Sequence, residues 1–255
     1  MLLGSFSAAR IFTSAFALFS CTLVGCAHYA TPGGPADFKA MRMTREQLTE
    51  ASISDTLAKV PLAKFPCGIA AVRIQAPGYR SDTAEGWGKG SYSIITTRDI
   101  EKDGQFERLS KLPMIADIAP INRLLLPEQL NSDAELRKAA ASLHADMVLI
   151  YTVDTTFKTN DAAVPLTVIT LGLSPNQVVH VTSTASAVLI DTRDGYLYGY
   201  AEATEKTNQL TSAWTNEPAA DSARRRAEEK AFDKLTVELE KTWGKVVKTY
   251  ATAQK

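Results

Sequence analysis

Apolar residues repeat with two different periods in the second half of the chain, and the change of period predicts strands followed by a helix. From 177 to 190, "QVVHVTSTASAVLI" alternates every second residue, as in a half-buried strand. The "DTRDG" turn at 191–195 joins this segment to "YLYGYAEATEK", which together predict a β-hairpin. From Pro218 to about Thr249 apolar residues step by four, which predicts one long helix. The stripe consists of Ala223, Ala227, Ala231, Leu235, Leu239, Trp243 and Val247, widened by Phe232, Val246 and Tyr250.

The first half mixes short strands and helices. Apolar runs predict strands at 66–76, 91–97, 122–127 and 146–157, with a further apolar run at 164–173. Capping boxes at 44–47 and 132–135 predict helices that begin near 45 and 133, and 101–112 predicts a short helix. Together the elements predict an α/β (α+β) sandwich, with a mixed sheet, an antiparallel C-terminal meander and a long C-terminal helix.

The N-terminal segment has the features of an export signal. Residues 11–24 are apolar or small, and as a helix they would span about 21 Å, less than the roughly 30 Å of bilayer hydrocarbon. Such a run suits a signal peptide, although Arg10 is the only charge before it. Leu23-Val24-Gly25-Cys26 resembles the bacterial lipobox, in which the cysteine thiol receives a diacylglycerol, so we expect lipidation at Cys26. An ordinary cleaved signal and an uncleaved anchor remain the alternatives.

These features predict three segments: a lipoprotein signal peptide at 1–25, a lipidated tether at 26–40 and a single periplasmic domain at 41–255. The tether is predicted from "HYATPGGPAD", which is rich in proline and glycine. Because Ala27 follows the cysteine instead of aspartate, resemblance to the enterobacterial sorting rule favours the outer membrane, and inner-membrane anchoring stays open. Anchored this way, the protein meets the membrane through its N-terminal lipid.

Charge and cysteine content narrow the function classes. The formal net charge of the whole chain is +0, so nothing favours nucleic acid as a partner. Cleavage before Cys26 would leave Cys67 as the only other thiol, which cannot form an internal disulfide. We expect Cys67 to be a small buried residue at the start of a strand, with a reactive or intermolecular role as the alternative.

The familiar catalytic and cofactor motifs are not matched. "EGWGKGSYS" at 85–93 lacks the Ser or Thr that follows the lysine of a phosphate loop, and Ser91 occupies the place of the third glycine of a dinucleotide fingerprint. The three histidines, His28, His144 and His180, are too widely spaced to suggest a zinc site. We therefore predict no catalytic, cofactor-binding or metal-binding residues, and no enzyme, although residues that converge only in three dimensions would escape this reasoning.

One loop offers candidate partner contacts. Residues 76–93, "APGYRSDTAEGWGKGSYS", form a long segment in which aromatic and basic residues are spread, and such residues on loops are common anchors for a protein partner. The candidates are Tyr79, Arg80, Trp87, Lys89 and Tyr92. The alternative is that the rings fold down over the sheet.

Two stretches together resemble a known family. "LRKAAASLHADMVLIYTVDTTF" and "ASAVLIDTRDGYLYGYAEAT" resemble the periplasmic α/β domain of the curli-secretion-channel lipoproteins. The same fold is shared more loosely by penicillin-binding-protein activator lipoproteins, a polysaccharide-export lipoprotein and the N-terminal domain of TolB-like proteins. The resemblance implies a lipid-anchored envelope protein that assists or regulates the assembly of another envelope component, or of copies of itself, without catalysis.

The pore-forming members of that family suggest an alternative function, a subunit of an oligomeric outer-membrane secretion pore. It would require residues 164–190 to insert into the membrane. Alternation places Val179, Val181, Ala185, Ala187 and Leu189 on one face of that segment, opposite His180, Thr182, Thr184 and Ser186. The simpler interpretation is a soluble sheet whose apolar face lies under a helix.

Overall fold

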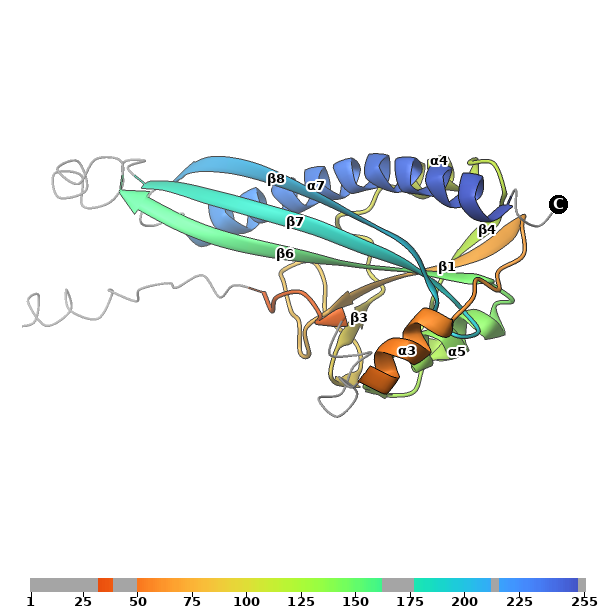
Figure 1. Cartoon of the computed structure of the whole chain (residues 1–255). Helices are drawn as coiled ribbons and strands as arrows, with labels where there is room; N and C mark the ends of the chain where they lie inside the picture. Colours follow the sequence, from red (N-terminus) through yellow and green to blue (C-terminus); the bar gives the residue numbers. More distant parts are fainter. Residues whose placement is uncertain (1–31, 39–49, 162–176, 212–215, 252–255) are drawn as a thin grey trace, which may run out of the picture. The chain divides into compact units, whose positions relative to one another are not determined.

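A computed structural model describes residues 32–38, 50–161, 177–211 and 216–251, which belong to one folded unit (Figure 1). Six of its strands form a mixed sheet in the order β3-β1-β6-β7-β8, with β4 also paired to β1. These strands are β1 (Cys67–Gln75), β3 (Ser93–Ile95), β4 (Ile115–Pro120), β6 (Met147–Asp161), β7 (Gln177–Asp191) and β8 (Leu197–Thr211). Two short strands, β2 (Lys89–Gly90) and β5 (Gln129–Leu130), pair separately.

The directions of the strands confirm the predicted fold class. β1 runs parallel to β4 and β6, whereas β6, β7 and β8 form an antiparallel meander. The helices are α3 (Glu50–Ala58), α4 (Asp103–Ser110), α5 (Asp133–Ser142) and α7 (Asn216–Val246), and α7 continues into a short π-helix at Val247–Ala251. The sheet is therefore mixed, and a long helix follows its last strand in the chain.

Alternation along β1 divides the core into two layers. Cys67, Ile69 and Ala71 pack on the face covered by α7 and α4, whereas Ala70 and Val72 point to the other face and pack around α5. β6 follows the same rule, because Leu149 belongs to the first layer and Val148 to the second. The sheet is thus buried on both faces along β1 and the first part of β6.

The predicted apolar face of β7 lies under the long helix. Val181, Ala185 and Leu189 are buried, while the residues between them are half-buried or buried. Opposite them, the predicted stripe of α7 is buried from Ala223 to Trp243. Small residues on both elements let the helix approach the sheet closely. The predicted apolar face therefore lies under a helix over 180–190, whereas residues 162–176 lie outside the described residues.

The "DTRDG" turn is a structural junction. The Asp191 carboxylate accepts hydrogen bonds from the main-chain N–H groups of Leu62 (3.1 Å) and Arg193 (2.8 Å) and from the Tyr198 hydroxyl (2.8 Å). The Arg193 guanidinium in turn donates to Asp146 (3.0 Å), just before β6. The turn thereby joins the hairpin to the segment before β1 and to the start of β6.

One sequence prediction differs from the structure, and one strand was not predicted. Residues 122–127, predicted as a strand, contain a 3-10 helix at Arg123–Leu125, because the Asn122 side chain accepts from the Leu124 N–H (3.0 Å) and caps the turn. Leu124 is 87% exposed and Leu125 37%, so of the three leucines that suggested a strand only Leu126 is buried. The edge strand β4 was not predicted, since its residues are mostly half-buried or exposed and lack a clear period.

Part of the predicted tether is packed against the folded unit. Pro35 bridges Gln75 at the end of β1, and the Ala76 N–H donates to the Gly34 carbonyl (3.0 Å). Ala36 is 7% exposed and joins the α5 layer of the core. The folded unit therefore already includes 32–38, ahead of the predicted boundary at 41. Within the described ranges, no helix is long and apolar enough to span a membrane.

Candidate ligand-binding crevice

Two strands end opposite each other along the same edge of β1. β4 runs parallel to β1 and ends where Pro120 pairs with Ala71, whereas antiparallel β3 ends where Ile95 pairs with Arg73. A crevice of about 200 Å³ lies there. Its lining comprises Ala71, Val72, Arg73, Ile95, Thr96, Thr97, Arg98, Glu101, Phe106, Ile118, Pro120, Ile121, Asn122 and Tyr151.

A buried ion pair lies at the crevice floor. Arg73, 1% exposed, points from β1 toward the α7 side, and its Nη1 lies 2.8 Å from Asp99 Oδ1 and 3.7 Å from Glu101 Oε1. The Tyr151 hydroxyl donates to Glu101 Oε1 (3.0 Å). The Arg73 guanidinium also donates from Nη2 to the Tyr79 hydroxyl (3.4 Å). The Nε–H of Arg73 is buried and has no hydrogen-bond partner. Such orphan donors are rare in folded proteins and cost about 1–3 kcal/mol each.

Burial dominates the electrostatics of the floor. It raises the pKa of the Glu101 carboxyl above its usual range, against the lowering effect of the Arg73 charge. Burial alone would lower the pKa of Arg73, but the carboxylates of Glu101 and Asp99 outweigh it and raise that pKa, so Arg73 stays charged. Burial and then Glu101 raise the pKa of Tyr151, which therefore remains a hydroxyl donor.

A second buried ion pair lies on α7. Arg224, 0% exposed, contacts Glu228 Oε2 through Nη1 (2.6 Å) and Asp221 Oδ1 through Nε (2.9 Å). Thr155 on β6 donates to Glu228 Oε1 (2.9 Å), and burial raises the pKa of Glu228. Breaking one partner of such a pair leaves an uncompensated buried charge, which costs about 3–5 kcal/mol. These groups hold the first half of α7 against the sheet.

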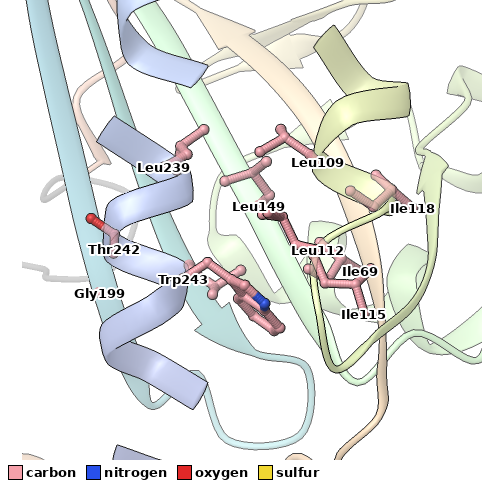
Figure 2. Close-up of a pocket in the computed structure, with 11 residues that line it drawn as sticks. Ile69, Leu109, Leu112, Ile115, Ile118, Leu149, Gly199, Leu239, Thr242 and Trp243 are labelled. Atoms are coloured by element: carbon pink, nitrogen blue, oxygen red, sulfur yellow. The ribbon is translucent and has the colours of Figure 1, made fainter. Parts of the chain in front are cut away.

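A smaller apolar pocket lies next to the crevice, between α4, β4 and α7. Figure 2 shows Leu239, Thr242 and Trp243 of α7 across from Leu109, Leu112 and Ile115, and the pocket holds about 30 Å³. Trp243 lines this pocket, and its Nε1–H donates to the Pro113 carbonyl (2.8 Å). A space of this size and polarity suits one methyl-sized group and supplies no polar contact that could orient a ligand.

The structure corrects the predicted partner loop in part. Tyr79 (2% exposed) and Tyr92 (0% exposed) are core residues, so they are not surface anchors, and for them the alternative of rings folded over the sheet is correct. Trp87 is half-buried and packs against the α5 layer. Arg80 and Lys89 are on the surface, each in an ion pair, with Glu85 and Glu128 respectively. A role of these two in binding a partner stays a prediction.

The remaining cysteines and histidines singled out in the sequence are placed as follows. Cys26 and His28 lie outside the described residues. Cys67 is buried, and burial raises the pKa of its thiol to about 12, which makes it inert at neutral pH. His180 contacts Asn208 (2.8 Å) across β7 and β8. In the part of the chain that the structure describes, no three His, Cys, Asp or Glu side chains are grouped as a metal site.

Sequence reasoning missed the crevice, although a signal for it was present. Arg73 and Gln75 occupy alternate positions of an otherwise apolar strand, "CGIAAVRIQ", so both point to the same buried face. Arg224 and Glu228 stand four apart, next to the alanine stripe of α7. Charged residues in such positions are almost never fully buried without partners, which marks them for a polar cluster inside the fold.

No family model and no curated protein matches the sequence. Among solved structures, a Xanthomonas campestris protein of family DUF330 aligns over 78% of this chain and 92% of its own, with 13% identity and a TM-score of 0.35. The lipoprotein GNA1162 of Neisseria meningitidis aligns over 56% of this chain and 84% of its own, with 15% identity and a TM-score of 0.28. The PelC dodecamer of Paraburkholderia phytofirmans aligns over 69% of this chain and 91% of its own, with 15% identity and a TM-score of 0.28. At TM-scores below 0.5, these likenesses carry no argument about this chain, and the resemblance to curli-secretion-channel lipoproteins stays a prediction.

Proposed function

We propose that this protein is a lipid-anchored accessory protein of the bacterial envelope, which acts by binding another envelope component and not by catalysis. The observation that carries the proposal is the Leu23-Val24-Gly25-Cys26 sequence placed directly before a folded domain. A diacylglycerol on Cys26 would hold the domain at a membrane surface, with the outer membrane favoured by Ala27.

The docked segment 32–38 makes this anchor short. Pro35 and Ala36 are held against Gln75 and the Thr152 hydroxyl, the latter through the Ala36 N–H (3.2 Å). Only the stretch from Cys26 to Pro32 then separates the lipid from the folded unit, and at about 3.3–3.6 Å per residue it reaches roughly 20 Å at most. The domain would therefore work close to the membrane, which suits a component of a membrane-bound assembly.

The anchor is tested by labelling bacteria that express the full chain with a clickable palmitate analogue. We expect the label on the wild-type protein and its loss in Cys26→Ser, together with release from the membrane fraction. Cys21→Ser and Cys67→Ser are matched controls that should keep the label. A Cys26→Ser protein that stays labelled and membrane-bound would contradict the proposal.

The accessory role is tested separately by native mass spectrometry of the wild-type protein extracted in mild detergent. A lipidated monomer or dimer is the expected result, because a closed ring of many subunits would instead support the secretion pore. Crosslinking in intact cells, read out by mass spectrometry, should then identify a second envelope protein held next to the domain.

A further inference from the structure

We infer that the domain rests on the phospholipid surface with the side of the sheet that carries α3 and α5, and that α3 and the loop at 123–125 insert apolar side chains into the lipid. The inference rests on the proposed lipid anchor at Cys26, which would hold the domain within reach of a bilayer. It adds which side of the domain touches that bilayer and through which residues.

The most exposed apolar side chains lie on this side of the sheet. Leu124 (87% exposed) and Leu57 (81%) are the two most exposed large apolar residues in the part of the chain that the structure describes. Leu57 belongs to α3, which Figure 1 shows with α5 on one side of the sheet, opposite α7. Both helices contact the turn at 191–195, through Lys59 (2.8 Å) just after α3 and through Arg137 of α5 (3.0 Å).

The loop at 123–125 and one residue of β8 lie on the same side. Ile121 and Leu126, which flank the loop, are buried in the core layer around α5. Tyr200 of β8, 74% exposed, pairs with Val188, which packs against that layer. Because residues paired across two strands share one face of the sheet, the Tyr200 ring is also on the α5 side.

The outer face of α7, on the opposite side of the sheet, is charged instead. Lys230, Lys234, Lys241 and Lys245 are exposed along it. Among the described side chains of α7, the single exposed large apolar one is Val237, at 41%. A face of this composition is stable in water, so the two sides of the domain differ in what they can contact.

α3 buries almost nothing against the domain. Residues 53–58 are all exposed, and Ser52 is half-buried. A helix of nine residues is marginal in water unless packing covers an apolar face. Ile53 and Leu57 stand four residues apart on one face of α3, whereas Asp55 lies away from that face. An apolar surface against Ile53 and Leu57 would stabilise α3, as it does for amphipathic helices at membrane surfaces.

The anchor supplies such a surface. The stretch from Cys26 to Pro32 reaches at most about 20 Å, so the domain stays beside the bilayer. Leu57 and Leu124 project from separate segments, and lipid can close around each of them, whereas a protein partner would need pockets at matching positions. Arg123, beside Leu124, is exposed and makes no ion pair with any described residue, so its guanidinium can pair with a lipid phosphate.

Fluorescence quenching of the lipidated full chain tests the inference, in vesicles of phosphatidylethanolamine and phosphatidylglycerol. Leu57→Cys and Leu124→Cys are labelled in separate variants with a thiol-reactive environment-sensitive dye, and Val237→Cys is the matched control on α7. The native Cys67 is buried and should not take the dye. A nitroxide near the top of the lipid acyl chains should lower the emission at 57 and 124 by at least about twofold and leave 237 unchanged.

Flotation of the same vesicles separates this inference from the anchor. A chain that stays behind when the vesicles float would overturn the anchor and, with it, the inference. A chain that floats without quenching at 57 or at 124, or with equal quenching at 237, would overturn the inference alone. Dyes at 57 and 124 that change emission in native membranes but not in pure lipid would assign this side to a protein partner, which also overturns it.

Discussion

The side-chain amide of Gln75 pairs with the main chain of Val153 as a peptide group of a neighbouring strand would. Its Nε2 donates to the Val153 carbonyl (3.0 Å), and its Oε1 accepts from the Val153 N–H (3.2 Å). The main-chain register between β1 and β6 extends only from Ile69 to Val72 on β1, so this side chain continues the pairing beyond its end. The Thr152 hydroxyl, which also receives the Ala36 N–H, donates to the same oxygen.

Gln75→Ala should therefore lower the free energy of unfolding by about 2–4 kcal/mol. The substitution leaves a buried N–H and a buried C=O of Val153 without partners, and each such group costs about 1–3 kcal/mol. Urea denaturation followed by circular dichroism measures the loss. Gln129→Ala is the control, because Gln129 is exposed on β5 and should change stability by less than about 0.5 kcal/mol. Equal effects of the two substitutions would contradict the role given to Gln75.

Close approach of α7 to β8 depends on the absence of a side chain at Gly199. A Cβ there would lie 2.7 Å from Thr242 Cγ2, inside the contact distance of two carbon atoms. The Thr242 hydroxyl also donates to the Tyr200 carbonyl (3.2 Å), which holds this threonine in place. Gly199→Ala should destabilise the protein by about 1–3 kcal/mol through overpacking.

The clash can be relieved from the helix side. Thr242→Ser removes the methyl group and keeps the hydroxyl, so most of the cost of Gly199→Ala should disappear in the double variant. Thermal or urea unfolding of the wild type, both single variants and the double variant gives the coupling energy, which we expect to be about 1 kcal/mol or more. Additive effects would show that the two groups do not meet.

A third prediction concerns the "DTRDG" turn. In Asp191→Asn one amide NH₂ must face donors, either the Arg193 N–H or the pair formed by Leu62 N–H and Tyr198 O–H. The conflict is buried, because Asp191 is 0% exposed, so we expect a loss of about 2–4 kcal/mol in stability by urea denaturation. Asp154→Asn, at an exposed position of β6, should be neutral. A neutral Asp191→Asn would mean that the turn needs no acceptor there.

Periodicity predicted the parts of this fold that bury a regular face. The alternation in β7 and the four-residue step in α7 identified two elements that pack on each other, since Ala185 and Leu189 share one core cluster with Leu235. Periodicity could not place β4, whose six residues gain their structure from pairing with β1 and not from a buried face of their own. The ion pairs of Arg73 with Asp99 and Glu101 depend on which segments are neighbours in space, which no local pattern contains, whereas the pairs of Arg224 lie within α7 at spacings of three and four residues.

The last prediction uses the pH dependence of stability to test the burial of Cys67. Burial raises the pKa of its thiol from 9.0 to about 12. Above pH 9 the unfolded chain loses this proton while the folded chain keeps it, so the free energy of unfolding falls by up to about 1.4 kcal/mol per pH unit until about pH 12. Below pH 9 both states hold the proton, and this contribution is fully present.

Cys67→Ala isolates that contribution from the tyrosines, whose raised pKa values act in the same direction above pH 10. Urea denaturation of both proteins at pH 8, 9, 10 and 11 gives the free energy of unfolding at each pH. Above pH 9 this free energy should fall less steeply with pH in the variant, because the variant lacks the one proton that the unfolded Cys67 loses. The native thiol should also resist iodoacetamide at pH 8 and react once urea unfolds the chain, since only the thiolate is nucleophilic. Identical pH profiles, or rapid alkylation of the native protein, would show that Cys67 is exposed.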